Sequence, residues 1–578
     1  MKKNTVLRMV GYLTKYRGLL IGSFIGALLF VPLALLGPVF IGRAIDAIVG
    51  KDNVDFNTAF INIILLLAVM LASCVLQWLM LVCTRKLSAY AAQEMRRQAF
   101  DRLQDVPLAR IDTQAHGDIV SRLVNDLDAV GEGFLQGLTQ FFPSIVTIVA
   151  TVVLMLYLDV RIALVVILVT PLSVIFAKVI TGRTSGLFKK QMNTQGDSSG
   201  YIGEMVANQE VVRAFGYEEE SEKEYSALNK SFADAYYKAT FYSSVVNPGT
   251  RLVNAIVYAA AGIFGAVIAI SGGISIGGIS AFLAYANQYT KPFNEISAVF
   301  TQLQAAVAGA ERVFTIIDWP VQTLDKTDAI TLQSCEGNVE AKDLFFSYTP
   351  TTKLIQNFNM QAAKGQRIAL VGPTGCGKTT LINLLMRFYE VDSGIISVDG
   401  MPIDDMKRNA LRSLYGMVLQ ETWLQKASVR DNIAYAKPGA SIEEVIEASK
   451  AAYAHHFIMR LPQGYDTILD TGSGNLSAGQ KQLLCIARIM LAKPDMLILD
   501  EATSSIDTRT ELLIQKALEK LMAGHTSFIV AHRLSTIQNA DIILVMRDGK
   551  IIESGNHTYL LAQNGFYANL YNSQFNVE

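Results

Sequence analysis

Apolar residues dominate the first half of the chain, in long runs that contain no charged side chain. These uncharged runs cover residues 19–41, 59–83, 138–158, 162–177, 252–270 and 274–289. A helix needs about 20 apolar residues to cross a bilayer, whereas a buried helix of a soluble protein keeps one polar face. The pattern therefore predicts six membrane-spanning helices with the lipid bilayer as their solvent.

The second half of the chain has a different pattern. From Gly337 onward, short apolar runs of strand length alternate with longer helical patterns, which is typical of an α/β domain with a mainly parallel sheet. We therefore predict a membrane all-α six-helix domain at residues 1–320, a linker at residues 321–336 and an α/β domain at residues 337–578.

Charged residues between the apolar runs predict the orientation in the membrane. Lys and Arg concentrate in two linkers, residues 84–137 and 182–250, whereas the other connections carry little charge. Basic connections stay on the cytoplasmic side, so both termini and the α/β domain are expected in the cytoplasm. Both linkers are rich in strong helix formers, which predicts helices that continue beyond the bilayer.

Composition argues against two other kinds of site. The five cysteines have no paired spacing suited to a disulfide framework or a metal centre, and isolated thiols are expected. The net charge is −1, and no basic surface with interleaved aromatic residues stands out, so no nucleic-acid partner is expected.

A glycine-rich loop follows the apolar run at residues 367–371. Its residues are Gly372, Pro373, Thr374, Gly375, Cys376, Gly377, Lys378, Thr379 and Thr380, and a helical pattern follows. The glycines let successive backbone N–H groups face phosphates, Lys378 is expected to reach the terminal phosphates, and the Thr379 hydroxyl is a candidate Mg²⁺ ligand. This strand, loop and helix order predicts a phosphate-binding site.

Two further motifs lie downstream of this loop. An apolar run ends in Asp500 and Glu501, which suit a Mg²⁺ ligand and a carboxylate that polarises the attacking water, respectively; plain surface polarity is the alternative. About 20 residues earlier, residues 475–480 read NLSAGQ and open an amphipathic helix. Ser477, Gly479 and Gln480 of this segment are candidate anion contacts at the helix N-terminus.

In their order and spacing, these motifs resemble those of ABC transporters of the exporter type, and the resemblance covers essentially the whole chain. It implies a P-loop ATPase that uses ATP and Mg²⁺. It further implies that Tyr348 stacks on adenine and that Gln420 senses Mg²⁺ and the γ-phosphate. Asp507 is expected at the dimer junction, and His532 beside the γ-phosphate.

The resemblance also implies a second half-transporter subunit, because two nucleotide domains meet head to tail around each ATP. The signature here reads LSAGQ rather than the common LSGGQ, and residues 470–475 also depart from the family pattern. The Ala478 Cβ is expected to restrict φ and crowd the phosphate. We therefore favour a heterodimer, with a homodimer that tolerates alanine as the alternative. Coupling helices are expected near residues 117–122 and 215–218.

The sixth apolar run carries polar residues that bear on the substrate. They are Tyr285, Asn287, Gln288 and Tyr289, and each either faces a cavity or packs between helices. We expect ATP-driven export of amphipathic, multidrug-like small molecules across the cytoplasmic (inner) membrane. The alternatives are an importer of a siderophore-like solute built on this architecture, or a lipid or peptide exporter. The apolar runs argue against a soluble ATPase.

Overall fold

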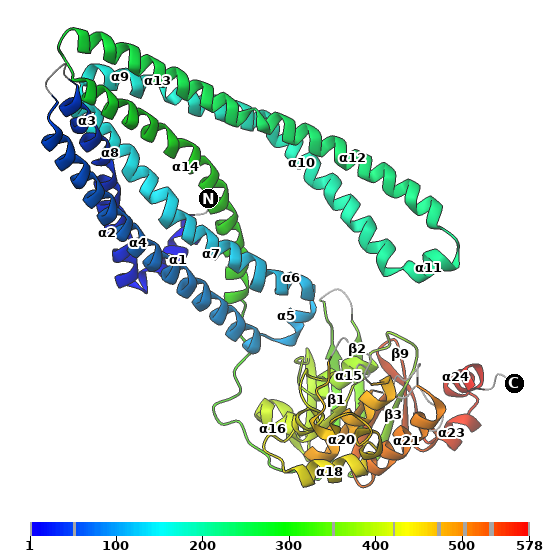
Figure 1. Cartoon of the computed structure of the whole chain (residues 1–578). Helices are drawn as coiled ribbons and strands as arrows, with labels where there is room; N and C mark the ends of the chain where they lie inside the picture. Colours follow the sequence, from blue (N-terminus) through cyan, green and yellow to red (C-terminus); the bar gives the residue numbers. More distant parts are fainter. Residues whose placement is uncertain are drawn as a thin grey trace. The chain divides into compact units, whose positions relative to one another are not determined.

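The computed structural model describes residues 3–49, 54–349, 353–419, 422–470, 476–500, 506–530 and 537–575. The chain divides into two compact units, which Figure 1 colours along the sequence. The first, the helical unit, comprises Met1–Asp105 and Ala115–Trp319. The second, the two-sheet unit, comprises Val106–Gln114 and Pro320–Glu578.

The helical unit is all-α, as the apolar runs predict. Its helices, including the π-helical segments η1 and η2, are α1 (Lys3–Thr14), α2 (Arg17–Leu35), α3 (Gly37–Ile48), α4 (Phe56–Asp105), α6 (His116–Ser121), η1 (Arg122–Asp126), α7 (Leu127–Gln136), η2 (Gly137–Phe141), α8 (Phe142–Leu158), α9 (Val160–Val169), α10 (Pro171–Ala207), α11 (Gln209–Ala214), α12 (Glu218–Ser244), α13 (Val246–Ile270) and α14 (Ile276–Ile317). Helix α4 has 50 residues and α10 has 37, far more than a bilayer requires. The predicted helical extensions are therefore confirmed.

Four helical stretches among the residues that the structure describes are long and apolar enough to span a membrane. They are Arg17–Ile48, Phe56–Asp105, His116–Leu158 and Arg251–Ile270. The fourth predicted run starts in α9 and continues through Thr170, whose backbone is helical, into α10, where most side chains lie outside the described part of the chain. The sixth predicted run lies on α14, whose sequence carries several amide and charged side chains.

A tyrosine from α14 forms a hydrogen bond to the backbone at the break between α2 and α3. Pro38 follows the break and has no backbone N–H, and the Val39 N–H donates to the Leu36 carbonyl at 3.1 Å. The fully buried Tyr285 donates its hydroxyl to the Leu35 carbonyl at 2.6 Å. A carbonyl near the break thus receives a hydrogen bond from a helix far away in the sequence, as buried polar groups require.

The two-sheet unit has the predicted α/β architecture. Its helices are α5 (Leu108–Asp112), α15 (Lys378–Leu385), η3 (Ile403–Asp405), α16 (Arg408–Ser413), α17 (Val429–Ala434), α18 (Ile442–Ala451), α19 (His455–Ile458), η4 (Gly464–Asp466), α20 (Ala478–Ala492), α21 (Thr508–Met522), α23 (His557–Ala562) and α24 (Phe566–Phe575). Its strands are β1 (Val339–Phe346), β2 (Ile355–Ala362), β3 (Arg367–Val371), β4 (Ser393–Val398), β5 (Met401–Pro402), β6 (Tyr415–Val418), β7 (Met496–Asp500), β8 (Thr526–Val530), β9 (Ile542–Arg547) and β10 (Lys550–Gly555).

These strands form two sheets with different pairing. One is an antiparallel four-stranded sheet in the order β2-β1-β4-β5. The other has six strands in the order β10-β9-β3-β8-β7-β6, and β9, β3, β8, β7 and β6 run parallel. Parallel strands end at one shared edge of a sheet, so the residues that follow them are brought to the same edge.

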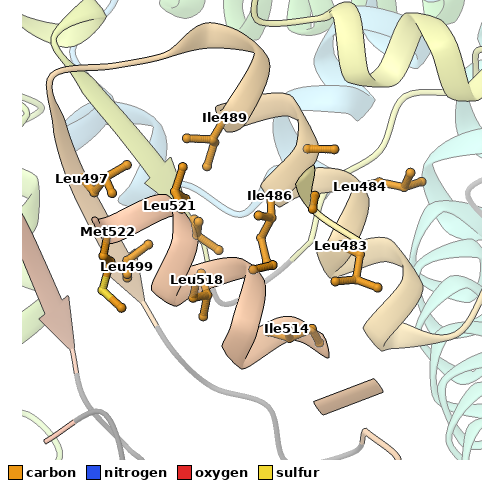
Figure 2. Packing of buried hydrophobic residues seen from close by; sticks show 14 of the residues in the cluster. Leu483, Leu484, Ile486, Ile489, Leu497, Leu499, Ile514, Leu518, Leu521 and Met522 are labelled. Carbon is orange, nitrogen blue, oxygen red and sulfur yellow. The ribbon is translucent and has the colours of Figure 1, made fainter. Parts of the chain in front are cut away.

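The central strands β3, β7 and β8 of the six-stranded sheet are buried on both faces, which explains their continuous apolar sequences. Along β7, Met496 and Ile498 face the cluster that includes α15, while Leu497 and Leu499 face the cluster that includes α20 and α21. Figure 2 shows the second cluster, in which Leu497 and Leu499 lie beside side chains of α20 and α21. The sheet is therefore a packed platform from which its strand ends project.

Candidate nucleotide site

The glycine-rich loop links β3 to α15 in the middle of the six-stranded sheet. Gly375 and Gly377 have φ values of 83° and 104°, which lie in the region that favours glycine. A Cβ on Gly372 would lie 2.2 Å from the Met546 carbonyl oxygen of β9, so only glycine fits there. Successive N–H groups in such a loop form a concave anion-binding surface at the start of a helix.

Lys378 begins α15 and lies across the glycine loop. Its side chain is buried, and its ammonium group donates to the carbonyls of Gly372 at 2.8 Å and Pro373 at 3.0 Å. The Cys376 sulfur lies 3.9 Å from the same nitrogen. The cation is therefore held inside the loop, where it adds positive charge to the backbone N–H groups expected to face phosphates.

Tyr348 contacts the same helix through its hydroxyl, which lies 3.2 Å from the Thr380 Oγ1. Its ring packs edge-on against Tyr389, with centroids 5.0 Å apart, and against Phe346 at 4.9 Å. The side chain remains 49% exposed, so part of the ring is open to a stacking partner. This position is compatible with the expected adenine contact.

The remaining candidate catalytic residues follow neighbouring parallel strands. Asp500 is the last residue of β7, and it is partly exposed. Gln420, Glu501 and His532 lie outside the described residues, but they follow β6, β7 and β8 within one or two positions. Because β6, β7, β8 and β3 are successive neighbours and parallel, the ends of these strands lie at the edge that carries the glycine loop.

The signature segment begins α20 with a capping box. The Ser477 hydroxyl accepts from the Gln480 backbone N–H at 3.3 Å, and the Gln480 side chain accepts from the Ser477 N–H at 3.0 Å. Both side chains thus hold the helix N-terminus together, while the Ser477 hydroxyl hydrogen stays available for an anion. Ser477 itself is exposed, as a contact with an incoming ligand requires.

Gly479 joins this segment to the helix that Asp507 caps. A Cβ on Gly479 would lie 2.4 Å from Thr510 Cγ2 and 2.9 Å from Ile506 Cγ2, so the two helices meet at this glycine. The Asp507 carboxylate accepts from the Thr510 N–H at 2.9 Å, and this bond lowers the pKa of Asp507. The two sequence motifs are therefore parts of one packed corner.

Ala478 differs from the sequence-based expectation. It is the first residue of α20, and it is absent from the residues with positive φ. Alanine adopts helical backbone angles without strain, so the expected restriction of φ does not apply here. Ala478 is exposed, and its methyl group projects where a glycine would leave space. Of the two effects expected from the Ala478 Cβ, crowding of an approaching phosphate is the one that still applies.

A hard-oxygen donor set for Mg²⁺ is present around the loop. Thr379 lies exposed in the first turn of α15, directly after Lys378, and Asp500 ends β7. Hydroxyl and carboxylate oxygens are the ligands that Mg²⁺ prefers, with phosphate oxygens and water completing its shell. The residues present therefore fit Mg²⁺ bound together with a nucleotide.

Two family models match the chain: the ABC transporter transmembrane region over residues 20–293, and the ABC transporter model over residues 355–504. The uncharacterized ABC transporter ATP-binding protein YfiC of Bacillus subtilis is 39% identical over 99% of this chain and 94% of its own length. This chain is an ABC transporter. It combines the membrane region and the ATP-binding domain in one polypeptide and is therefore an exporter-type half-transporter, a class that acts as dimers.

Other relatives of this ABC transporter carry different substrate names. A fatty acid ABC transporter ATP-binding/permease protein of Mycobacterium tuberculosis is 39% identical, over 90% of this chain and 82% of that protein. YgaD of Bacillus subtilis, named provisionally as a multidrug export ATP-binding/permease protein, is 36% identical over 83% of each. A solved bacterial Atm1-family ABC exporter with ATP bound superposes with a TM-score of 0.77 at 27% identity, covering 97% of this chain and 98% of that chain. The family activity is ATP-driven export.

The first expected coupling segment of this transporter overlaps the short helix α6, and sequence reasoning did not identify Tyr389. Val106–Gln114, which contains α5, belongs to the two-sheet unit, whereas the expected residues 117–122 lie in the helical unit. Within the two-sheet unit, Tyr389 donates its hydroxyl to the Asp112 carboxylate at 2.5 Å, and burial followed by Asp112 raises the pKa of Tyr389. Tyr389 also packs on Tyr348, so α5 connects to the expected adenine contact. The sequence feature that could have identified Tyr389 is its position as an aromatic residue shortly after α15.

In the second expected coupling segment, residues 215–217 form a turn and Glu218 begins α12. Gly216 has a φ of 61°, and the short helix α11 ends just before this turn. The turn joins α11 to α12, and Phe215 is 82% exposed at this point. The segment is therefore an exposed apolar tip.

Proposed function

We propose that this chain exports amphipathic small molecules across the cytoplasmic membrane, with its termini and nucleotide-binding domain in the cytoplasm. The observation that carries this proposal is a cavity of about 560 Å³ in the helical unit, lined by α2, η2, α8 and α14. Drug-sized ligands occupy pockets of about 300–1,000 Å³. Its walls combine apolar side chains with hydroxyl and amide groups, which suits amphipathic ligands.

Only one of the four polar α14 residues singled out from sequence lines this cavity. Gln288 does, whereas Tyr285 bonds to the Leu35 carbonyl and Tyr289 packs edge-on against Phe293 with centroids 5.2 Å apart. Asn287 is exposed. Gln288 is therefore the member of this set that supports a substrate-facing role, while both tyrosines belong to a buried cluster between helices.

In the proposed mechanism, the glycine loop and Lys378 bind the phosphates of ATP, and Tyr348 stacks on its adenine. Thr379, Gln420 and Asp500 would hold Mg²⁺, which neutralises charge that develops on the phosphates. Glu501 orients the water that attacks the γ-phosphate, with His532 beside that phosphate. Ser477, Gly479 and Gln480 then act in the partner's site, because two nucleotide domains meet head to tail, with Asp507 at the junction.

We further propose a heterodimer in which the partner has an intact LSGGQ signature. The support is the Ala478 methyl group, which projects from the first turn of α20 toward the solvent side. A homodimer would place this methyl group in both nucleotide sites. If this chain, purified alone, forms a stable dimer that hydrolyses ATP and transports substrate in liposomes, the homodimer is correct instead.

A transport assay tests the proposed function directly. The transporter, purified from its native membranes through a tag on this chain, would be reconstituted with the nucleotide domains outside the vesicles. Vesicles that take up labelled amphipathic compounds on adding ATP support export, because uptake from this side corresponds to export from the cell. Vesicles that are instead emptied by ATP would establish the importer alternative. Uptake restricted to lipids or peptides would establish the alternative of a lipid or peptide exporter.

A further inference from the structure

The cavity in the helical unit contains one ionisable side chain, and this feature goes beyond the proposed function on which it rests. Glu295 of α14 is the single acidic or basic residue among those that line the cavity, which lies within the described part of the chain. Its Oε2 accepts a hydrogen bond from the Ser144 hydroxyl of α8 at 3.1 Å. The carboxylate is thus positioned by a second helix, with acceptor capacity left over.

The position along α14 places this carboxylate near the membrane. Glu295 is the twentieth residue of α14, which begins at Ile276, and a helix of that length spans about 30 Å, close to the thickness of a bilayer core. This length places Glu295 near one end of the bilayer core, and the residue is exposed, so its carboxylate keeps its charge at a lower cost than one at the bilayer centre. Lys291 lies one turn earlier, but no ion pair joins it to Glu295 among the described contacts.

The rest of the lining divides into two kinds of surface. Phe30, Val31 and Leu35 of α2 supply an apolar wall, and Gln288 lies two turns from Glu295 on α14. Residues seven apart on a helix lie on the same face, so the amide and the carboxylate point to one side. A ligand in this cavity therefore meets an apolar surface together with an anionic group.

We propose that this cavity selects amphipathic cations, with the Glu295 carboxylate binding a protonated or quaternary amine and the α2 wall binding its apolar part. A carboxylate attracts such a head group and repels an anionic one. The same charge disfavours fatty acids, whose head group is itself a carboxylate. The selected substrate class would then differ from that in the name of the fatty acid relative.

The test compares two xanthene dyes of similar shape and opposite charge. Binding of rhodamine 123, a cation, and of fluorescein, an anion, would be measured by fluorescence anisotropy on the transporter in nanodiscs, purified through a tag on this chain. We expect wild type to prefer the cation, and Glu295→Gln to weaken its binding about tenfold, equivalent to about 1.4 kcal/mol. Glu295→Lys should reverse the preference. Glu311→Gln, on α14 but outside the cavity, is the matched control and should retain it.

The outcomes separate this inference from the function on which it rests. Equal binding of both dyes by wild type, or unchanged cation affinity in Glu295→Gln, overturns charge selection and leaves export of amphipathic compounds standing. If wild type binds neither dye, both charge selection and the proposed export of amphipathic compounds are contradicted. Retained helix content, measured by circular dichroism beside ATP binding, shows that both units of each variant are folded, so a lost preference cannot be attributed to unfolding.

Discussion

In the two-sheet unit, polar groups with a predicted role gather where parallel strands end, whereas in the helical unit they lie singly along long helices. The glycine loop, Asp500 and the positions of Glu501 and His532 all follow neighbouring strands of one sheet. In the helical unit, Gln288 and Glu295 share one cavity, while Tyr285 is used to seal a helix break. Backbone topology determines where the residues of the strand-end site lie, whereas side-chain packing determines which residues line the cavity of the helical unit.

This difference explains why one site is common to the family and the other varies. A strand end and a glycine loop present the same N–H groups whichever solute is moved. A cavity between helices changes its chemistry when one or two side chains change, because each contributes separately. Relatives with fatty acid and multidrug names fit this view, since they share the ATP-binding domain.

The largest expected effect lies at the strand-end site. Glu501→Gln should retain ATP binding and reduce hydrolysis about a hundredfold or more, because the amide no longer polarises the attacking water. ATPase rates and nucleotide binding would be measured on the same preparation, with Glu519→Gln, an exposed change on α21, as the control. Near-normal turnover in Glu501→Gln would refute the assigned role.

Lys378→Ala should act on binding rather than on turnover. It removes a buried ammonium group that donates to the Gly372 and Pro373 carbonyls, and with it a charge expected to reach the phosphates. Charge-assisted bonds contribute about 1.5–3 kcal/mol, so ATP affinity should fall at least about tenfold. Lys364→Ala, which is exposed, controls for loss of charge alone. Equal affinities in the two variants would count against the assignment.

Gly479→Ala should destabilise the corner that joins α20 to α21. Its Cβ would lie 2.4 Å from Thr510 Cγ2, and overpacking of this kind costs about 1–3 kcal/mol. The neighbouring Ala478→Gly change affects an exposed residue and should leave the thermal unfolding midpoint nearly unchanged while easing phosphate access. Similar midpoints in the two variants would show that the close approach at Gly479 is not needed for stability.

The smallest effect is expected at Tyr348. Tyr348→Ala removes both the ring and the hydroxyl contact with Thr380, and aromatic stacking contributes about 0.5–1.5 kcal/mol, so ATP affinity should fall about fivefold. Tyr348→Phe keeps the ring and should lose less. Titration of a fluorescent ATP analogue measures both changes, and equal losses would contradict stacking.

The sequence predicts the elements around the glycine loop well because its signals are local. The glycine loop, the apolar strand before it and the helix after it are consecutive, and the structure has them as β3 and α15. Contacts between distant segments were not predictable in this way. Tyr285 and Leu35 are 250 positions apart, and Tyr389 meets Asp112 across 277.

Uptake into vesicles tests the central claim most directly. Proteoliposomes with outward-facing nucleotide domains would receive rhodamine 123 and ATP, with wild type compared against Glu501→Gln at matched protein content. The account predicts ATP-dependent accumulation inside wild-type vesicles and about a hundredfold less in the variant, in proportion to lost hydrolysis. Accumulation that is equal in the two preparations, or release of preloaded dye on adding ATP, would contradict ATP-driven export by this chain.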